Sequence, residues 1–162
     1  MHVTKEEVKR LLKYNPITGD FTWKPAKGEK WAGKLAGNIN TGGYRRIFIL
    51  GKYIAAHRLA FMYMSGNIPP AVDHIDGNKL NNSWNNLRSC TTGENNCNVG
   101  PRANSKSGIK GVSWHKASNK WIVQVGAGGK KKYIGVFKNL ELAELIAHEA
   151  RLKFHKEFAR SK

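Results

Sequence analysis

The stretch that decides the fold is Val72-Asp73-His74-Ile75-Asp76-Gly77-Asn78, which is followed by Asn86-Leu87-Arg88 and then by Glu94-Asn95. A carboxylate stands here beside an imidazole, on a short apolar run that ends in an Asp-Gly turn. A carboxylate oxygen is a hard metal ligand, and an imidazole has an ordinary pKa near neutrality. The pair suits hydrolysis. Taken alone, it also fits an ordinary strand end with a surface Asp and His, so its context decides between the two.

The context is a three-part motif. Asp73-His74-Ile75, Asn86-Leu87-Arg88 and Thr91-Thr92-Gly93-Glu94-Asn95 stand in the order and spacing of the HNH nuclease motif. Residues 57–98 resemble phage and intron-encoded HNH homing endonucleases. The resemblance implies two short strands and a helix around one divalent ion, a ββα-metal core at about residues 70–98. We expect the strands over 72–75 and 87–90, and a helix after Thr91, whose hydroxyl forms a capping box with Glu94.

The same resemblance assigns a role to each motif residue. Asp73 and Asn95 would bind Mg²⁺ (or Mn²⁺ as a substitute), with the scissile phosphate and water completing an octahedral shell. His74, neutral at physiological pH, would take a proton from the attacking water, while the metal stabilises the departing 3′ oxygen. Asn86 would hold the intervening loop and orient His74. The family often has His at the third position, and Asn96 remains a rival ligand if the helix register is shifted by one.

Charge is distributed unevenly along the chain. The 162 residues carry a formal net charge of +17. Residues 1–56 hold 11 basic and 4 acidic side chains, residues 57–100 hold 3 of each, and residues 101–162 hold 14 basic and 4 acidic. Basic flanks around a neutral centre fit a bound polyanion, with DNA as the expected partner. Solubility charge alone fits less well at this magnitude, and a cationic membrane-surface protein fits less well still. No stretch approaches ~18 apolar residues, and no signal peptide is expected.

The two cysteines, Cys90 and Cys97, have six residues between them and no CxxC pair. They cannot build the two-pair zinc site that some HNH proteins carry. So few thiols predict a reducing cytoplasm, that of a bacterial host if the chain is phage-encoded, and a Cys90 that packs inside as a small apolar residue.

The first residues predict a short helix. Thr4 and Glu7 form a capping box, and apolar residues follow at helical spacing, namely Val8, Leu11 and Leu12. Residues 21–23 read as a strand. Residues 14–23 and 43–59 also resemble the leader of the same phage HNH proteins, which extends the likeness over nearly the first hundred residues.

A hairpin is expected next, joining residues 44–50 to residues 53–55 around Gly51-Lys52. Its Arg45 and Arg46 could contact DNA phosphates or form a solvated strand edge.

His57 opens a short helix whose apolar residues are Leu59, Phe61, Met62 and Met64. A histidine in that place favours a structural role over binding metal or phosphate, and His74 is the better base.

Residues 101–108 form a basic linker in which Arg102 and Lys106 could track the DNA backbone. Three strands are expected beyond it, over 109–114, 121–125 and 130–136, and then a helix over 140–159.

Lys110-Gly111-Val112-Ser113-Trp114, Lys120-Trp121 and Tyr133-Ile134-Gly135, together with the Ala-rich helix, resemble the APETALA-type (ethylene-response-factor) DNA-binding domain. That family lays its sheet into the major groove, and an antiparallel sheet can keep one face for DNA while a helix covers the other. The candidate DNA contacts are Lys110, Trp114, Lys116, Trp121, Gln124 and Lys132. Each tryptophan could pack in the core instead. Ser113 and His115 stand where bidentate guanine readers would be expected, so specificity for G-rich sites does not carry over.

The sequence therefore predicts an α+β chain: an HNH endonuclease domain with an N-terminal α/β extension over residues 1–100, a linker over 101–108, and a small three-stranded antiparallel sheet with one helix over 109–162. Its expected function is Mg²⁺-dependent hydrolysis of double-stranded DNA by a homing-type endonuclease, with a monomer that nicks one strand favoured. The alternative is a DNA-binding regulatory protein that keeps the HNH fold without activity.

Overall fold

The computed structural model describes residues 3–101, 104–127, 129–155 and 158–159. The chain divides into two compact units, Met1–Thr91 and Thr92–Lys162. Each unit has its own cluster of buried apolar side chains. The sequence placed the division after residue 100, whereas the structure places it between Thr91 and Thr92.

The N-terminal unit opens with helix α1 (Lys5–Leu11), and the predicted capping box at its start is confirmed. The Glu7 backbone N–H donates to the Thr4 hydroxyl at 3.3 Å, and the Thr4 backbone N–H donates to the Glu7 carboxylate at 3.0 Å. Leu12 was expected in the helix but is extended, with φ −127°. It begins strand β1 (Leu12–Tyr14), because it pairs with Trp23 of strand β2 (Phe21–Trp23).

A second sheet has the order β3-β4-β5, formed by Asn38–Ile39, Arg45–Ile49 and Lys52–Ala55. The predicted hairpin is confirmed, but its turn lies one residue earlier than expected, at Leu50-Gly51, because Lys52 pairs with Ile49. Leu50 and Gly51 both have positive φ, 50° and 77°, as a tight two-residue hairpin turn requires. Helix α2 (Ala56–Ser65) follows directly and ends at Gly66, whose left-handed conformation lets its N–H donate to Met62.

Strands β6 (Ala71–His74) and β7 (Leu87–Cys90) form an antiparallel pair, which confirms both predicted strands to within one residue. Short 3₁₀ turns occur elsewhere in this unit, at Pro25–Lys27 (η1), Glu29–Trp31 (η2) and Trp84–Asn86 (η3). Residues 75–86 form the loop between the two strands, and η3 is its last turn.

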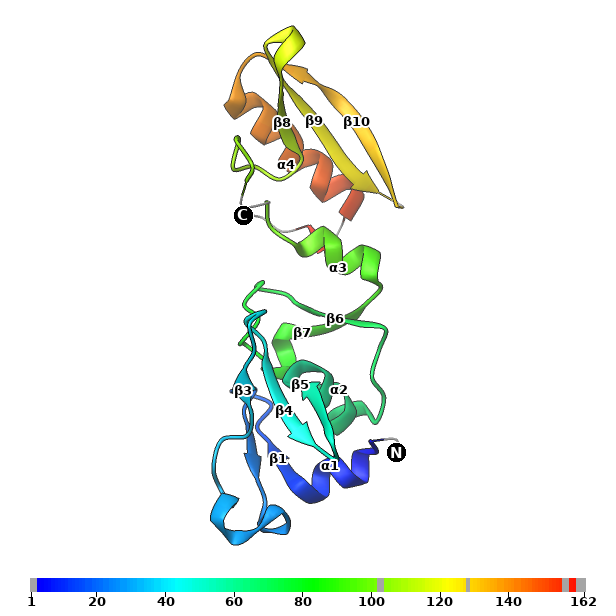
Figure 1. The fold of residues 1–162 in the computed structure, drawn as a ribbon. Coiled ribbons are helices and arrows are strands. Elements are labelled where there is room, and N and C mark those ends of the chain that lie inside the picture. Colours follow the sequence, from blue (N-terminus) through cyan, green and yellow to red (C-terminus); the bar gives the residue numbers. More distant parts are fainter. Residues whose placement is uncertain (1–2, 102–103, 128, 156–157, 160–162) are drawn as a thin grey trace. The chain divides into compact units, whose positions relative to one another are not determined.

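The C-terminal unit contains helix α3 (Thr92–Asn98) and a three-stranded antiparallel sheet of order β10-β9-β8. Helix α4 packs on this sheet, with Ala143 and Ala147 fully buried beside Val123 (Figure 1). The three predicted strands and the helix are confirmed as elements. Their bounds are β8 (Val112–His115), turn η4 (Lys116–Ser118), β9 (Lys120–Ala127), β10 (Lys130–Phe137) and α4 (Leu140–His155).

Strand β8 begins at Val112 rather than at residue 109 because Gly111 makes a turn with φ +84°. A side chain at Gly111 would lie 2.5 Å from the Gln124 carbonyl oxygen, and the Gln124 N–H donates to the Gly111 carbonyl at 2.8 Å. This close approach fixes where the strand starts. Within the described ranges, no helix combines the length and apolar character needed to cross a membrane.

Candidate active site

Asp73 lies on β6, directly opposite Arg88 of β7. The carboxylate is buried, and its Oδ2 accepts a hydrogen bond from Arg88 Nε at 2.7 Å and forms an ion pair with Arg88 Nη2 at 2.6 Å. The strand register therefore explains the ion pair. Because two guanidinium N–H groups hold one oxygen, the carboxylate has a fixed orientation. The sequence analysis gave Arg88 no role. Its position within the second predicted strand of the motif could have indicated that it faces Asp73.

His74, the next residue, is also buried, and its Nε2 lies 3.2 Å from Asn82 Oδ1. Burial lowers the pKa of His74, while the Asn82 hydrogen bond and the nearby carboxylates of Asp76 and Asp73 oppose the shift. The net direction keeps the imidazole neutral at physiological pH, which is the form that can accept a proton.

The loop between β6 and β7 is held by Asn86, as the motif implied. Asn86 Nδ2 donates to Asp76 Oδ1 at 2.9 Å and to the Asn81 carbonyl at 2.8 Å, and Asn86 Oδ1 accepts from the Asp76 N–H at 3.0 Å. Burial disfavours the ionised form of Asp76, but hydrogen bonds from Asn81, Asn78 and Asn86 outweigh it, so the pKa of Asp76 lies below its usual value. Asn86 contacts the loop, whereas the observed partner of the His74 ring is Asn82.

Asn82 is only 2% exposed, and the turn between β1 and β2 holds it in place. The Tyr14 hydroxyl donates to the Asn82 carbonyl at 2.7 Å, and the Trp84 N–H donates to the Pro16 carbonyl at 2.8 Å. Gly19, with φ +79°, approaches so closely that a Cβ would lie 2.2 Å from the Asn82 carbonyl carbon. The backbone of the β1–β2 turn is therefore in direct contact with the backbone of the β6–β7 loop. Sequence reasoning missed Asn82, because nothing in the motif marks it.

Aromatic rings surround the other side of the His74 imidazole. The His57 ring meets it edge-on with centroids 5.1 Å apart, and the Tyr44 ring lies 5.4 Å from His57 and 6.1 Å from His74. His57 Nδ1 is buried without a hydrogen-bond partner among the described residues. Burial, with the charges of His74 and Arg58, lowers the pKa of His57 to about 3. His57 is therefore neutral at physiological pH, and its ring packs against those of His74 and Tyr44. A structural role for His57 remains the prediction.

The predicted metal ligands come from different elements. Asp73 is on β6, while Asn95 and its rival Asn96 are on α3, where Asn95 is half-buried and Asn96 exposed. In the part of the chain that the structure describes, no three His, Cys, Asp or Glu side chains cluster as a metal site. One carboxylate and one amide oxygen suit a hard ion such as Mg²⁺, which keeps several waters. Asp73 belongs to the N-terminal unit and Asn95 and Asn96 to the C-terminal unit, so their binding of one Mg²⁺ stays a prediction.

The candidate DNA-binding residues are spread over both units. The Arg46 guanidinium stacks 4.3 Å over the Tyr53 ring, and Arg45 Nη1 lies 3.5 Å from the Gly37 carbonyl. Lys106 and Lys116 are exposed. Arg102 lies outside the described residues.

In the C-terminal sheet, Trp114 and Trp121 face each other across β8 and β9 with ring centroids 4.8 Å apart. Trp121 packs against the core cluster, which favours the core alternative for that side chain. Lys132 lies over the Phe154 ring at 4.4 Å, and Gln124 is half-buried. Lys110 donates to backbone carbonyls at the end of α3, including Asn96 at 2.9 Å and Cys97 at 2.8 Å. DNA contact by these residues stays a prediction.

Comparison with known proteins places the motif in a family. A family model described as HNH endonuclease matches residues 54–97. Protein 3.8 of Escherichia phage T7 is 38% identical over 100 residues, 59% of this chain and 80% of that protein. An uncharacterized HNH endonuclease of Acanthamoeba polyphaga mimivirus is 37% identical over 90 residues, 52% of this chain and 47% of that protein. A solved structure titled "DNA binding and cleavage by the HNH homing endonuclease I-HmuI" has 28% identity and a TM-score of 0.43, and the match covers 76% of this chain and 71% of that one.

Proposed function

Because the chain belongs to the HNH endonuclease family, we propose that it is a homing-type endonuclease that hydrolyses phosphodiester bonds of double-stranded DNA with a divalent metal ion. The observation that carries the proposal is the buried pair on β6, where Arg88 holds the Asp73 carboxylate and Asn82 holds the His74 imidazole. Burying a carboxylate and an imidazole on consecutive residues costs free energy that two surface groups would not, which favours a chemical use for both.

His74 is the general base in this proposal. The Asn82 side-chain oxygen can only accept a hydrogen bond, so it selects the imidazole tautomer that carries its hydrogen on Nε2. In that tautomer the basic lone pair is on Nδ1. The proton of the attacking water would therefore move to Nδ1, and the ring would become a cation while Asn82 keeps its orientation. The lowered pKa of His74 keeps the imidazole ready to accept that proton at physiological pH.

Asp73 and Asn95 are the proposed metal ligands. Arg88 holds the Asp73 carboxylate in one orientation. Its positive charge also lowers the affinity of that carboxylate for a metal ion. A bound Mg²⁺ supplies a Lewis acid for the scissile phosphate and charge stabilisation for the departing 3′ oxygen. Mn²⁺ has similar preferences for oxygen ligands and is the expected substitute.

The C-terminal unit is the proposed targeting module. All three exposed lysines among the candidate contacts belong to it: Lys106, and Lys116 and Lys132 on or beside an antiparallel sheet. Lysines act mainly through phosphate contacts, which position a protein on DNA without reading sequence. This proposal includes binding of DNA by the C-terminal sheet in the APETALA-type manner. It also includes nicking of one DNA strand by a monomer.

The test is incubation of the full chain with supercoiled plasmid in Mg²⁺, in Mn²⁺ and in excess chelator. We expect conversion to open circles with either metal and none in chelator, and linear product only if two nicks coincide. Band-shift binding to the same DNA is measured in parallel. Intact binding with no cleavage in any divalent metal would favour the alternative, a DNA-binding regulatory protein that keeps the HNH fold.

A further inference from the structure

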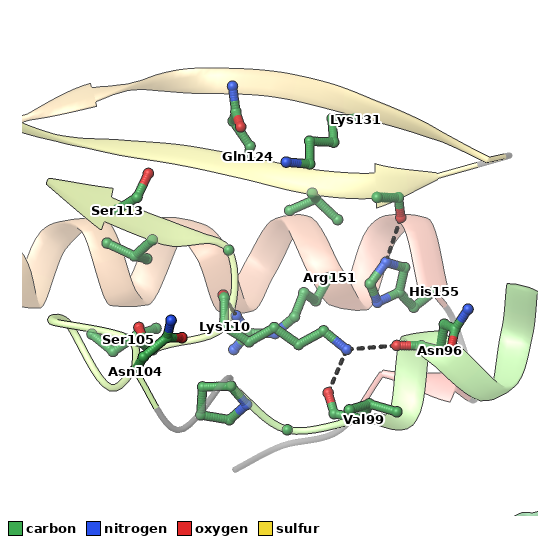
Figure 2. A pocket seen from close by; sticks show the side chains of 17 residues that line it. Asn96, Val99, Asn104, Ser105, Lys110, Ser113, Gln124, Lys131, Arg151 and His155 are labelled. Carbon is green, nitrogen blue, oxygen red and sulfur yellow. Dashed lines mark hydrogen bonds between the residues drawn. The ribbon is translucent and has the colours of Figure 1, made fainter. Parts of the chain in front are cut away.

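A pocket of about 500 Å³ lies wholly within the C-terminal unit, between the end of α3, residues 104–111 and the last turns of α4 (Figure 2). The ionisable side chains that line it are Lys110, Lys131, Arg151 and His155. Among the residues that the structure describes, no aspartate or glutamate lines this pocket. The described part of its wall therefore combines several basic side chains with no carboxylate.

Arg151 is the least ordinary of these side chains, because a guanidinium is rarely buried without a carboxylate partner. It is only 7% exposed. Its Nη1 donates to the Lys110 carbonyl at 2.6 Å, and its Nε is buried without a hydrogen-bond partner in the described part of the chain. Burial lowers the pKa of Arg151, and the Glu144 carboxylate only partly offsets this. The group still stays charged, since a guanidinium does not lose its proton in proteins.

His155 repeats this arrangement one turn further along α4. It is also 7% exposed, and its Nε2 donates to the Gly126 carbonyl at 2.6 Å. Its Nδ1 is buried without a hydrogen-bond partner within the described ranges. Burial lowers the pKa of His155, the Gly126 carbonyl raises it, and the positive charges of Lys110 and Arg151 lower it again. Figure 2 shows Arg151 and His155 on the same side of the pocket.

The cost of this arrangement points to a ligand. A buried cation that is only partly compensated destabilises a fold, and the usual further compensation is an anion with hydrogen bonds to it. The Lys110 ammonium also lines the pocket, where it donates to the Asn96 and Cys97 carbonyls at the end of α3. Asn104, Ser105 and Ser113 add neutral polar groups to the lining.

We propose that this pocket binds a phosphate group, with Arg151 and His155 as its main partners and Lys131 at its exposed side. Arginine presents a planar fork of N–H groups that matches phosphate oxygens, and a phosphate oxygen can also accept from a protonated imidazole. Neither Asp73 nor His74 lines the pocket, whereas two of the candidate DNA contacts, Lys110 and Gln124, do. The phosphate belongs either to the DNA backbone or to a free phosphate or mononucleotide. The first alternative rests on the proposed function, and the second does not.

The first experiment asks whether the full chain binds inorganic phosphate. Thermal unfolding is followed in phosphate and in chloride at equal ionic strength. Phosphate well above its Kd should raise the Tm of the wild type by roughly 2–4 °C more than chloride does. Arg151→Gln should lose this difference. The matched control is Lys153→Gln, which removes a positive charge from an exposed position on the same helix outside the pocket, and which should keep it.

A second variant covers the case in which Arg151→Gln fails to fold. Lys131 is exposed on β10, so Lys131→Gln should fold normally and should weaken the phosphate effect. An independent readout is the imidazole titration of His155 by NMR, since a bound anion should raise the pKa of His155. Equal Tm values in phosphate and chloride, together with an unmoved His155 titration, would overturn the proposal whatever the plasmid assay shows.

The second experiment separates the two sources of phosphate. The slope of log affinity for duplex DNA against log salt falls by about 0.9 for each DNA phosphate that the protein no longer neutralises. A shallower slope for Lys131→Gln and Arg151→Gln would assign the pocket to the DNA backbone. An unchanged slope, with the phosphate stabilisation intact in the wild type, would assign it to a free phosphate or a mononucleotide.

Discussion

Asp73 and His74 are neighbours on one strand, yet each is held by a different part of the N-terminal unit. The guanidinium of Arg88 holds the carboxylate from the adjacent strand, and the side-chain amide of Asn82 holds the imidazole from the loop. Successive side chains of a strand point to opposite faces, so the two groups need separate supports. Chemistry at one of them can therefore be removed without dismantling the other.

The first prediction concerns His74. Replacing it with Ala should lower the cleavage rate by about 10²–10⁴-fold while leaving DNA affinity nearly unchanged, because a general base acts in the transition state and contributes little to ground-state binding. Single-turnover nicking and band shifts on the same DNA measure the two quantities. Wild-type cleavage by this variant would remove His74 from the mechanism.

The second prediction separates Asn95 from Asn96. Asn95→Ala should lose metal-dependent nicking and Asn95→Asp should retain it, because Asp keeps an oxygen ligand. Asn96→Ala should be nearly silent, since neighbours on a helix point about a hundred degrees apart and the Asn96 group that Lys110 contacts is its backbone carbonyl, which the substitution keeps. A dead Asn96→Ala beside an active Asn95→Ala would show that the ligand is Asn96.

The third prediction concerns pH and His57. The pKa of His57 is about 3 in the folded chain, against 6.5 for an unburied histidine, so the unfolded chain binds more protons between these values. Its contribution to stability is complete above about pH 6.5 and is lost as the pH falls toward about 3. Between about pH 7 and about pH 5 the free energy of unfolding should drop by roughly 1–2 kcal/mol from this group.

Urea unfolding at the two pH values measures that change. The matched variant is His57→Phe, which fills similar space without a titrating group and should show a smaller drop than the wild type. An equal drop in both would assign the acid sensitivity to other groups.

At the scale of elements, the important contact is between the β1–β2 turn and the loop that joins β6 to β7. Tyr14, Pro16 and Gly19 supply it, and all three act through or against backbone atoms of the loop. Burial raises the pKa of Tyr14 to about 12, so its hydroxyl remains a donor at any physiological pH. The position of Asn82, and through it the orientation of His74, depends on this turn.

The fourth prediction compares two glycines of nearly equal conformation. Gly19 has φ +79° and Gly51 has φ +77°, so alanine at either position incurs a similar backbone strain of about 1 kcal/mol. A Cβ at Gly19 would meet the Asn82 backbone at 2.2 Å, whereas nothing lies within 4 Å of one at Gly51. Gly19→Ala should therefore lose stability and cleavage activity together, and Gly51→Ala should lose only a little stability. Similar behaviour of the two in chemical denaturation and nicking would contradict the close fit.

Local patterns predicted most elements of this chain, and contacts distant in sequence account for what they missed. Thr4 and Glu7, the Gly51 turn and the strand 87–90 depend on neighbouring residues, so the sequence alone was sufficient for them. Leu12 left its helix because it pairs with Trp23, and no periodicity within the helix reports that partner. Asn82 is likewise defined by Tyr14 and Gly19, more than sixty positions earlier, where no motif links them.

At the scale of the whole molecule, basic side chains outnumber acidic ones in both flanks of the sequence and balance them in the centre. The two units each have their own core, so DNA affinity can be altered on the C-terminal unit without changing the packing around Asp73 and His74. Lys106 and Lys116 are suitable positions for lowering DNA affinity without disturbing a core, because both are exposed.

The fifth prediction uses these two lysines. In the full chain, Lys106→Gln with Lys116→Gln should lower DNA affinity and make the slope of log affinity against log salt shallower by about 1.8, about 0.9 for each DNA phosphate that is no longer neutralised. The nicking rate at saturating protein should stay near that of the wild type. An unchanged salt slope would remove both residues from the DNA interface.

The close contact between Gly19 and Asn82 also determines which residues must be kept when this protein is truncated or grafted into another one. The family model begins at residue 54, so a minimal cassette chosen by sequence similarity would omit the turn that supports the His74 loop. A graft of residues 54–97 into another protein should carry every motif residue and still be a poor catalyst. Adding residues 3–53 should restore it. In that case the segment needed for activity would be longer than the motif that the family model matches.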